Sequence, residues 1–268
     1  MNITFGFIGA GNMGGALAQA AAKALGGENI VLADQMTEKA AALAEKLGGR
    51  CADAGTVAQT CDYIFLGVKP QVMSAMLSEI SPALSSRESR FVLVSMAAGV
   101  AAADIQKMAG NNYPVIRIMP NMPVSAGSGV ILYDTTDNVS EEEAAKFCES
   151  MRFAGIVDHL PEKLIDAASA LSGCGPAFVS LFVEALADGA VACGLPRDKA
   201  LLYAIGTVKG TAAMLLESGM HPAQLKDAVC SPGGTTIAGV KALENGGLRG
   251  SVIGAVKAAY DRTLELGK

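Results

Sequence analysis

The sequence has few of the residues that metal sites and nucleic-acid surfaces need. It contains only two histidines, and its six cysteines include no Cys-x-x-Cys pair, so nothing completes a tetrahedral metal site. Lys and Arg number 21 against 26 Asp and Glu, which gives a net charge of −5, and the basic residues form no cluster. The attraction to phosphate backbones on which nucleic-acid binding depends is therefore missing. We expect no bound metal, no nucleic-acid partner, and reduced, mostly buried thiols.

Targeting and membrane segments are also missing from the pattern. No basic region precedes the apolar run from Ile3 to Ala10, so a signal peptide is not expected. The most apolar window, Ala177 to Leu195, contains Glu184 and Asp188, and charges inside a membrane span are unfavourable. We expect a soluble cytoplasmic protein without a membrane partner.

Charged residues are only 18% of the chain and apolar residues 51%, which excludes a disordered protein. The length of 268 residues corresponds to about two domains of ordinary size. The first half alternates β-rich runs with Ala-rich helical stretches, and from Glu162 onward no run is typical of a strand. We predict an α/β protein with a Rossmann-type wound parallel sheet over residues 1–158 and an all-helical dimerisation domain over residues 159–268.

The sheet is expected to have about six strands, with helices between them. The predicted strands are Thr4–Ile8, Ile30–Ala33, Tyr63–Leu66, Phe91–Ser95, Val115–Met119 and about Gly129–Tyr133, and the predicted helices are Gly14–Leu25, Thr37–Leu47 and Gln71–Ile80. A further helix start, Ser-Glu-Glu-Glu, opens the segment Ser140 to Phe153.

The helical half has more apolar surface than it can bury alone. The stretch Phe178 to Val191 is apolar on nearly every face, and Gly206 and Gly210 put small residues four apart on the next helix. Since a helical domain of this length offers too few neighbours, we expect an intertwined homodimer. A self-contained helical bundle is the alternative.

A glycine-rich turn, Gly9-Ala10-Gly11-Asn12-Met13-Gly14, follows the first strand and opens a helix. Its glycines allow a tight turn and let backbone N–H groups approach a pyrophosphate, which predicts dinucleotide binding. The next strand ends near Asp34, where an acid accepts hydrogen bonds from the adenosine ribose and repels a 2′-phosphate. No Arg follows within 34–37, so Asp34 favours NADH unless it is only an exposed loop acid.

Three more turns follow strands, and the carboxyl ends of strands line the ligand crevice of such a sheet. They are Val68-Lys69-Pro70, with Lys69 placed to face the cofactor, Ala97-Ala98-Gly99, small enough for a nicotinamide to pass, and Met119 to Pro123. The last is stiffened by prolines and contains Asn121, which both donates and accepts hydrogen bonds. Each alternatively is an ordinary connection.

In the helical half, Ser231-Pro232-Gly233-Gly234-Thr235-Thr236 precedes the helical run Ile237 to Leu243. Unpaired N–H groups at a helix start, with no side chain over Gly234, form a site for a carboxylate beside the hydroxyls of Thr235 and Thr236. The alternative is a simple N-cap by a threonine. The two histidines, His159 and His221, fit no nucleophile or acid pattern, and we expect both to be structural.

Together these motifs resemble the pyrroline-5-carboxylate reductases, which carry out the last step of proline synthesis. The likeness covers nearly the whole chain, and its most specific part is the Gly-Gly-x-Thr element. It rests on Phe7–Gly14, Val68–Pro70, Ala97–Val100, Met119–Asn121, Leu171–Ala177, Leu225–Asp227 and Ser231–Thr236. Three positions depart from the family pattern: Met122 replaces a usual Thr, Cys174 a usual Ser, and Phe178 a usual Tyr.

The resemblance implies hydride transfer from NADPH or NADH to a cyclic imine, which gives L-proline. It implies cofactor contacts from Gly9 to Met13, Val68, Lys69 and Ala98, and substrate contacts from Glu162, Thr235 and Thr236. It also implies a homodimer with interlocked helical domains, often as a ring of five dimers, with the substrate between the cofactor and the neighbouring subunit's helices. The family's common use of NADPH runs against Asp34, which stands where a small hydroxyl residue is frequent.

We predict that backbone N–H groups around Gly234 to Thr236 hold the substrate carboxylate, while the Thr236 hydroxyl bonds the ring nitrogen. Two other functions stay open. One is a β-hydroxyacid dehydrogenase, although the Lys followed three residues later by Asn of those enzymes is absent at Lys163 and Lys209. The other is a dinucleotide-sensing or assembly protein that retains the fold without the reaction.

Overall fold

The computed structural model describes residues 3–266 and divides into two compact units. The first unit ends at Gly173 and takes up the chain again from Tyr260, and the second unit is Cys174–Ala259. The last strand ends at His159, so the division between the compact units falls one helix later in the chain. The second unit is entirely helical.

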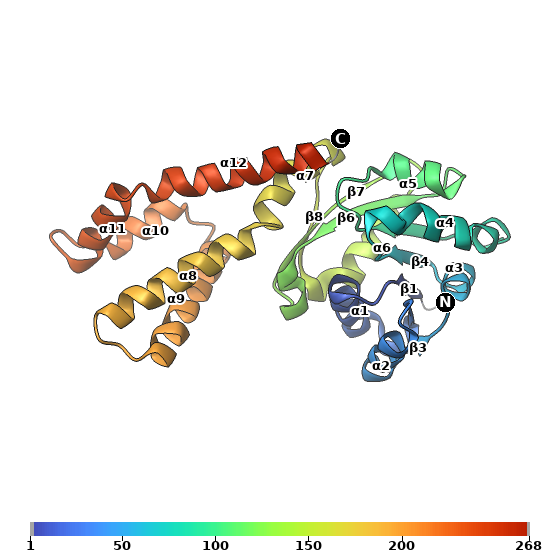
Figure 1. Cartoon of the computed structure of the whole chain (residues 1–268), viewed down its shortest axis with the longest axis horizontal. Coiled ribbons are helices and arrows are strands. Elements are labelled where there is room, and N and C mark those ends of the chain that lie inside the picture. The colour runs from blue at the N-terminus through green and yellow to red at the C-terminus, as the bar shows by residue number, and fades with distance from the viewer. Residues whose placement is uncertain (1–2, 267–268) are drawn as a thin grey trace. The chain divides into compact units, whose positions relative to one another are not determined.

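The first unit is built on an eight-stranded sheet with the order β3-β2-β1-β4-β5-β6-β7-β8 (Figure 1). All neighbouring strands are parallel except β6 and β7. The six strands from β3 to β6 follow the order of doubly wound dinucleotide-binding folds. The strands are β1 (Phe5–Ile8), β2 (Ile30–Ala33), β3 (Arg50–Cys51), β4 (Tyr63–Leu66), β5 (Val92–Ser95), β6 (Val115–Pro120), β7 (Gly129–Thr135) and β8 (Gly155–His159).

The predicted number of about six strands is wrong by two, because both edge strands were missed. β3 has only two residues, both exposed, and β8 is half exposed with Asp158 and His159 at its end. An edge strand has a neighbour on one side only and does not need the continuous apolar run of a central strand. The six predicted strands are confirmed to within two residues at each end.

The helices of the first unit are α1 (Asn12–Leu25), α2 (Thr37–Leu47), α3 (Ala54–Thr60), α4 (Pro70–Ser85), α5 (Ala102–Ala109), α6 (Glu141–Met151) and α7 (Glu162–Ser172). Short 3-10 turns lie at Gly27–Asn29, Met122–Ala126 and Arg152–Ala154. The short helices α3 and α5 were not predicted. The helix start at Ser140 is confirmed, since Ser140 and Glu143 form a complete capping box.

Two apolar layers cover the two faces of the sheet. Along β4, Tyr63 and Phe65 belong to one layer and Ile64 and Leu66 to the other, as the two-residue period of a strand requires. Helices α1 and α6 cover the first layer, where the rings of Phe7 and Phe65 stack 4.3 Å apart, and α3, α4 and α5 cover the second. Central strands buried on both faces are continuously apolar, and this is why the sequence identified them.

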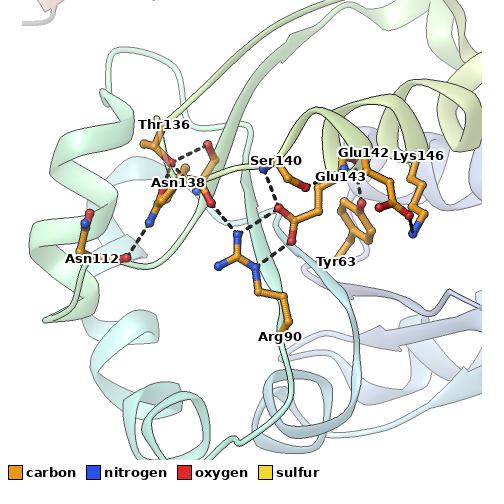
Figure 2. A network of polar contacts seen from close by, with 10 residues as sticks. Tyr63, Arg90, Asn112, Thr136, Asn138, Ser140, Glu142, Glu143 and Lys146 are labelled. Carbon is orange, nitrogen blue, oxygen red and sulfur yellow. Dashed lines mark hydrogen bonds and ion pairs between the residues drawn. The ribbon is translucent and has the colours of Figure 1, made fainter.

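A polar network closes the edge at which the parallel strands begin (Figure 2). Arg90, just before β5, holds both carboxylate oxygens of Glu143 at 2.8 and 3.0 Å, and donates to the carbonyl of Asn138. The Tyr63 hydroxyl, at the start of β4, donates to the Glu143 carbonyl oxygen at 2.8 Å. Ligands of doubly wound sheets bind at the opposite edge, so this network serves stability.

The second unit consists of α8 (Gly175–Ala192), α9 (Arg197–Ser218), α10 (Pro222–Val229), α11 (Thr235–Asn245) and most of α12 (Leu248–Leu266). Among its described residues only Ala187, Ala200 and Ala204 are buried apolar side chains. Large apolar side chains lie exposed on its helices, including Leu202, Leu216 and Ile253. By length and composition alone, Glu162–Ala192 and Arg197–Ser218 are long and apolar enough to cross a membrane.

All six cysteines are free thiols, but the expectation that most are buried is wrong. Only Cys61, packed under β1, is buried, and burial raises the pKa of its thiol to about 11, which makes it unreactive. Cys51 lies on the two-residue edge strand and Cys193 follows α8, so both are exposed. The prediction treated cysteines as small apolar core residues, but a single copy of the helical unit does not form a core that would bury them.

The Arg90–Glu143 pair predicts a pH-dependent term in stability. Burial raises the pKa of Glu143, but the hydrogen bonds from Arg90 and Ser140 outweigh it, and the net pKa is below the ordinary value of 4.5. A carboxyl with a lowered folded-state pKa adds stability above its unfolded pKa and loses it as the pH falls through the folded pKa.

We therefore expect Glu143→Gln, which retains the capping geometry, to cost about 1 kcal/mol at pH 7, because Arg90 is largely exposed. The difference from the unchanged protein should shrink as the pH falls from about 5 toward 3. Urea unfolding at a series of pH values measures it. A difference that stays constant over this range would contradict the assignment.

Candidate active site

The glycine turn between β1 and α1 is shaped by close backbone contacts. Gly9 has φ +107°, and a Cβ there would overlap the carbonyl oxygen of Gly67. A Cβ on Gly14 would overlap the carbonyl oxygen of Gly9. At Gly11, by contrast, no protein atom lies within 4 Å of where a Cβ would be. The space at Gly11 is therefore open, which is the arrangement a pyrophosphate requires for close approach to the backbone.

Gly11 is also the N-cap of α1, and no side chain caps this helix. The first N–H groups of α1, at Asn12 and Met13, face the end at which the helix dipole is positive. An uncapped helix start beside an open glycine is an anion site, and the pyrophosphate of a dinucleotide fits it. Ala10 is buried, whereas Asn12 is exposed.

Asp34 follows β2 and is tied to the glycine turn. One of its oxygens, Oδ2, accepts the Ala10 N–H at 2.7 Å, and Oδ1 accepts the Met36 N–H at 2.9 Å. These bonds fix the carboxylate at the carboxyl end of β2 while the residue stays partly exposed. A carboxylate has about four acceptor positions, so the remaining ones are free to accept ribose hydroxyls. Asp34 is therefore more than an exposed loop acid, since it anchors the turn.

The other predicted cofactor residues lie at the same edge of the sheet, because each follows a parallel strand. Val68 follows β4 and is partly buried, Lys69 is the exposed N-cap of α4, and Pro70 is its first residue. After β5, Ala97 is buried and Ala98 is exposed. The structure thus brings these turns to one edge, and contact of each with a cofactor stays a prediction.

Asn121, after β6, is buried and uses its amide within the protein. Its Nδ2 donates to the carbonyl of Ser172 at 2.9 Å, and its Oδ1 accepts the Val130 N–H at 2.9 Å. It therefore ties the last residue of α7 to the sheet. Asn121 thus both donates and accepts hydrogen bonds, as predicted, but its partners are groups of the protein. Contact of Asn121 with a cofactor stays a prediction.

Glu162, the first residue of α7, lies in an ion-pair cluster of the first unit. Its Oε1 accepts from Arg117 at 3.1 Å and from the Ala102 N–H at 2.8 Å. Asp166, one helical turn later, accepts from the other arm of the same guanidinium at 3.2 Å. Arg117 is only 5% exposed. The Glu162 N–H in turn donates to Asp134 at 2.5 Å.

The turn before α11 lies in the second unit, so the predicted substrate residues are divided between the two units. Gly234, and not a threonine, is the N-cap of α11, and no side chain caps it. The alternative of a threonine N-cap is therefore wrong. Gly233 has φ +70°, and both Thr235 and Thr236 are exposed in the first turn of the helix. Their uncapped N–H groups are open to a carboxylate.

Both histidines have local structural contacts. His159 Nε2 lies 3.2 Å from Asp134 Oδ1, and His221 accepts the Ala223 N–H in a capping box that starts α10. Within residues 3–266 no group of three or more His, Cys, Asp or Glu residues is placed to hold a metal ion.

Sequence reasoning missed Arg117, Asp134 and Asp166. One signal was available, since Arg117 is a charge inside the apolar run Val115 to Met119 and a buried Arg requires an acid partner. Glu162 and Asp166 are four apart, on one face of the predicted helical region. The sequence alone does not show that Glu162 and Asp166 are the acid partners of Arg117.

Two family models match the chain. Residues 162–266 match pyrroline-5-carboxylate reductase dimerisation, and residues 4–99 match NADP oxidoreductase coenzyme F420-dependent. The two matches cover the helical region and the glycine turn with the strands that follow it.

Relatives match over the full length. The pyrroline-5-carboxylate reductase of Glycine max is 41% identical over 98% of this chain and 96% of its own. A solved pyrroline-5-carboxylate reductase from Coxiella burnetii is 33% identical with a TM-score of 0.92, and all of both chains is covered. A Plasmodium falciparum pyrroline carboxylate reductase with NADP bound is 33% identical with a TM-score of 0.86, covering 100% of this chain and 99% of that one.

Two glycine substitutions test the site because they add the same methyl group in different surroundings. Gly11→Ala should leave the melting temperature unchanged, since the methyl meets no protein atom, but weaken NADH and NADPH binding about tenfold. Gly14→Ala should lower the melting temperature, because its methyl overlaps the Gly9 carbonyl. Thermal unfolding and fluorescence titration measure both. Unchanged cofactor affinity in Gly11→Ala would place the pyrophosphate elsewhere.

Proposed function

The chain belongs to the pyrroline-5-carboxylate reductase family, and we infer from this that it catalyses the last step of proline biosynthesis, the NAD(P)H-dependent reduction of 1-pyrroline-5-carboxylate to L-proline. The family match carries the inference, because both the dimerisation-domain family and the full-length relatives are pyrroline-5-carboxylate reductases. The open space beside Gly11 in the glycine turn agrees with cofactor binding. The competing β-hydroxyacid dehydrogenase assignment has no comparable support.

The first unit holds the cofactor, whose nicotinamide supplies the hydride when bound. The N–H groups at the start of α1, which no side chain caps, would hold the pyrophosphate, and Asp34, fixed by the Ala10 N–H at the end of β2, would accept the ribose hydroxyls. The small residues Ala97 and Ala98, after β5, leave room for the nicotinamide ring. These assignments follow from the position of each residue at the carboxyl edge of the sheet.

The turn before α11 holds the substrate. The substrate carboxylate accepts hydrogen bonds from the uncapped N–H groups in the first turn of α11, because Gly233 and Gly234 have no side chains to cover them. The Thr236 hydroxyl hydrogen-bonds the ring nitrogen and orients the imine carbon. A protonated iminium accepts a hydride readily, so no strong acid side chain is required, and rate comes chiefly from positioning.

Thr236→Ala tests this arrangement. We expect kcat/KM for pyrroline-5-carboxylate to fall on the order of 10²-fold, because one oriented hydrogen bond in a desolvated site is lost, while the Kd for NADH stays unchanged. Thr236→Ser, which retains the hydroxyl, should recover most of the activity. Cofactor oxidation with proline identified as product is the assay. Full activity of Thr236→Ala would remove Thr236 from the mechanism.

We also propose that this member of the family prefers NADH. The Asp34 carboxylate is fixed by two backbone N–H groups at the carboxyl end of β2, where we place the ribose. Residues 34–37 contain no Lys or Arg to bind a 2′-phosphate. A carboxylate beside a phosphate dianion repels it, and partial burial of Asp34 weakens the screening of that repulsion by water.

Asp34→Asn removes the charge and leaves the shape. We expect the ratio of kcat/KM with NADH to kcat/KM with NADPH to fall about tenfold or more in this variant, mainly through a gain with NADPH. The unchanged enzyme should favour NADH. A clear NADPH preference of the unchanged enzyme would contradict the proposed role of Asp34.

Residues 162–266 form the dimerisation domain, and exposed apolar side chains on its helices, such as Leu202, Leu216 and Ile253, supply surface for a second copy. We propose that the dimers assemble further into a ring of five. We also propose that the enzyme works in the cytoplasm, where its six free thiols remain reduced.

A further inference from the structure

We propose that Arg117 is a positioning residue of the reductase reaction, which acts through Glu162 on the turn between β5 and α5. This rests on the proposed function. Arg117 lies in the middle of β6, in register with Ser95 of β5 and Asp134 of β7. It is 5% exposed, and both arms of its guanidinium are bound to acids of α7. A cation buried to this degree depends on those partners.

Glu162 connects Arg117 to the carboxyl edge of the sheet, where we place the cofactor. Its Oε1 accepts from Arg117 and also from the Ala102 N–H, the first N–H of α5. Ala101, the N-cap of α5, makes no side-chain capping bond, so the carboxylate of a residue 60 positions away serves as the cap. The start of α5 is thus fixed by the Glu162 carboxylate as well as by the burial of Ala102 and Ile105 in the second apolar layer.

The α5 start ends the turn that contains Ala97 and Ala98. This turn has one internal backbone bond, from the Val100 N–H to the Ala97 carbonyl at 3.4 Å, and Gly99 within it has φ +72°. Ala97 is held by burial in the second apolar layer and by its N–H bond to Ser95 Oγ at 3.4 Å. The exposed residues Ala98 and Gly99 are the part of the turn that depends on the capped first turn of α5.

Glu162 cannot easily shift, because its own backbone is also held. Its N–H donates to Asp134 Oδ2, and Oδ1 of the same carboxylate accepts the Thr135 N–H at 2.8 Å and lies beside His159. The start of α7 is therefore fixed to β7 while its side chain fixes α5. Four groups on four elements form one connected unit: Arg117 of β6, Asp134 of β7, Glu162 of α7 and Ala102 of α5.

The consequence for the reaction lies in geometry and not in affinity. Hydride transfer requires the reacting atoms within about 3.5 Å, and a misplacement of about 1 Å costs on the order of 10²-fold in rate. The groups assigned to the pyrophosphate and ribose, at Gly11 and Asp34, lie on other turns. Disturbing the Ala97–Ala98 turn therefore lowers kcat and leaves cofactor affinity nearly intact.

The experiment compares three variants, Arg117→Met, Glu162→Ala and the double variant, with a control, Arg90→Met, which breaks an ion pair at the opposite edge of the sheet. Glu162→Ala removes the oxygen that accepts both from Arg117 and from the Ala102 N–H. We expect both single variants to lower kcat on the order of 10-fold or more, with Kd for NADH changed less than twofold. The kinetic isotope effect with 4-deuterated NADH should rise as hydride transfer limits the rate. The double variant should be no slower than the slower single variant, because both residues act through one contact.

Arg117→Lys, which retains a cation able to reach one acid, should recover part of kcat. Arg90→Met should keep full kcat, even if its melting temperature falls by as much as that of Arg117→Met. If Arg117→Met does not fold, Glu162→Ala still decides, because Arg117 then retains Asp166. Normal kcat in either folded single variant would overturn the proposal.

A selective rise of KM for pyrroline-5-carboxylate in Glu162→Ala alone would also overturn it, and would make Glu162 a direct substrate contact. Failure of the proposed function has a different signature, since the unchanged protein would then bind NADH but produce no proline, and both proposals would fall together.

Discussion

The turn at Gly9 runs so close to the turn at Gly67 that neither residue has room for a side chain. This backbone contact joins β1 and β4 at their carboxyl ends, and Gly14 brings α1 onto the carbonyl of the same Gly9. The bond from Ala10 to Asp34 then ties the end of β2 to the turn. The positions of Gly11 and Asp34 relative to each other are consequently set by one backbone arrangement.

The two edges of the sheet have different chemistry. Where the parallel strands begin, Arg90, Glu143 and Tyr63 satisfy one another within the protein, and the network is closed. Where they end, Gly11 and the first turn of α1 have backbone groups without a protein partner. The side-chain network is closed at the first edge, whereas at the second the carboxylates of Asp34 and Glu162 accept backbone N–H groups and the first turn of α1 stays uncapped.

Much of the fold and the glycine turn could be predicted from the sequence. The central strands were found because burial on both faces produces unbroken apolar runs, and the glycine turn because strand, turn and helix follow in order. The strands β3 and β8 were missed because edges lack that signal. The role of Arg117 was not readable, since its partners lie 45 and 49 residues away and only the fold brings them together. Asn121 was recognised as a two-way hydrogen-bonding residue, but its partner Ser172 was not foreseeable.

The small buried core of the helical unit has a thermodynamic consequence. Among its described residues three alanines are the only buried apolar side chains, and this is too little to offset the chain entropy lost on folding. Its folding free energy must come largely from association with a second copy. Dilution therefore favours unfolding of the helical unit, and the amount of enzyme in which this unit is folded depends on how much of the chain is made.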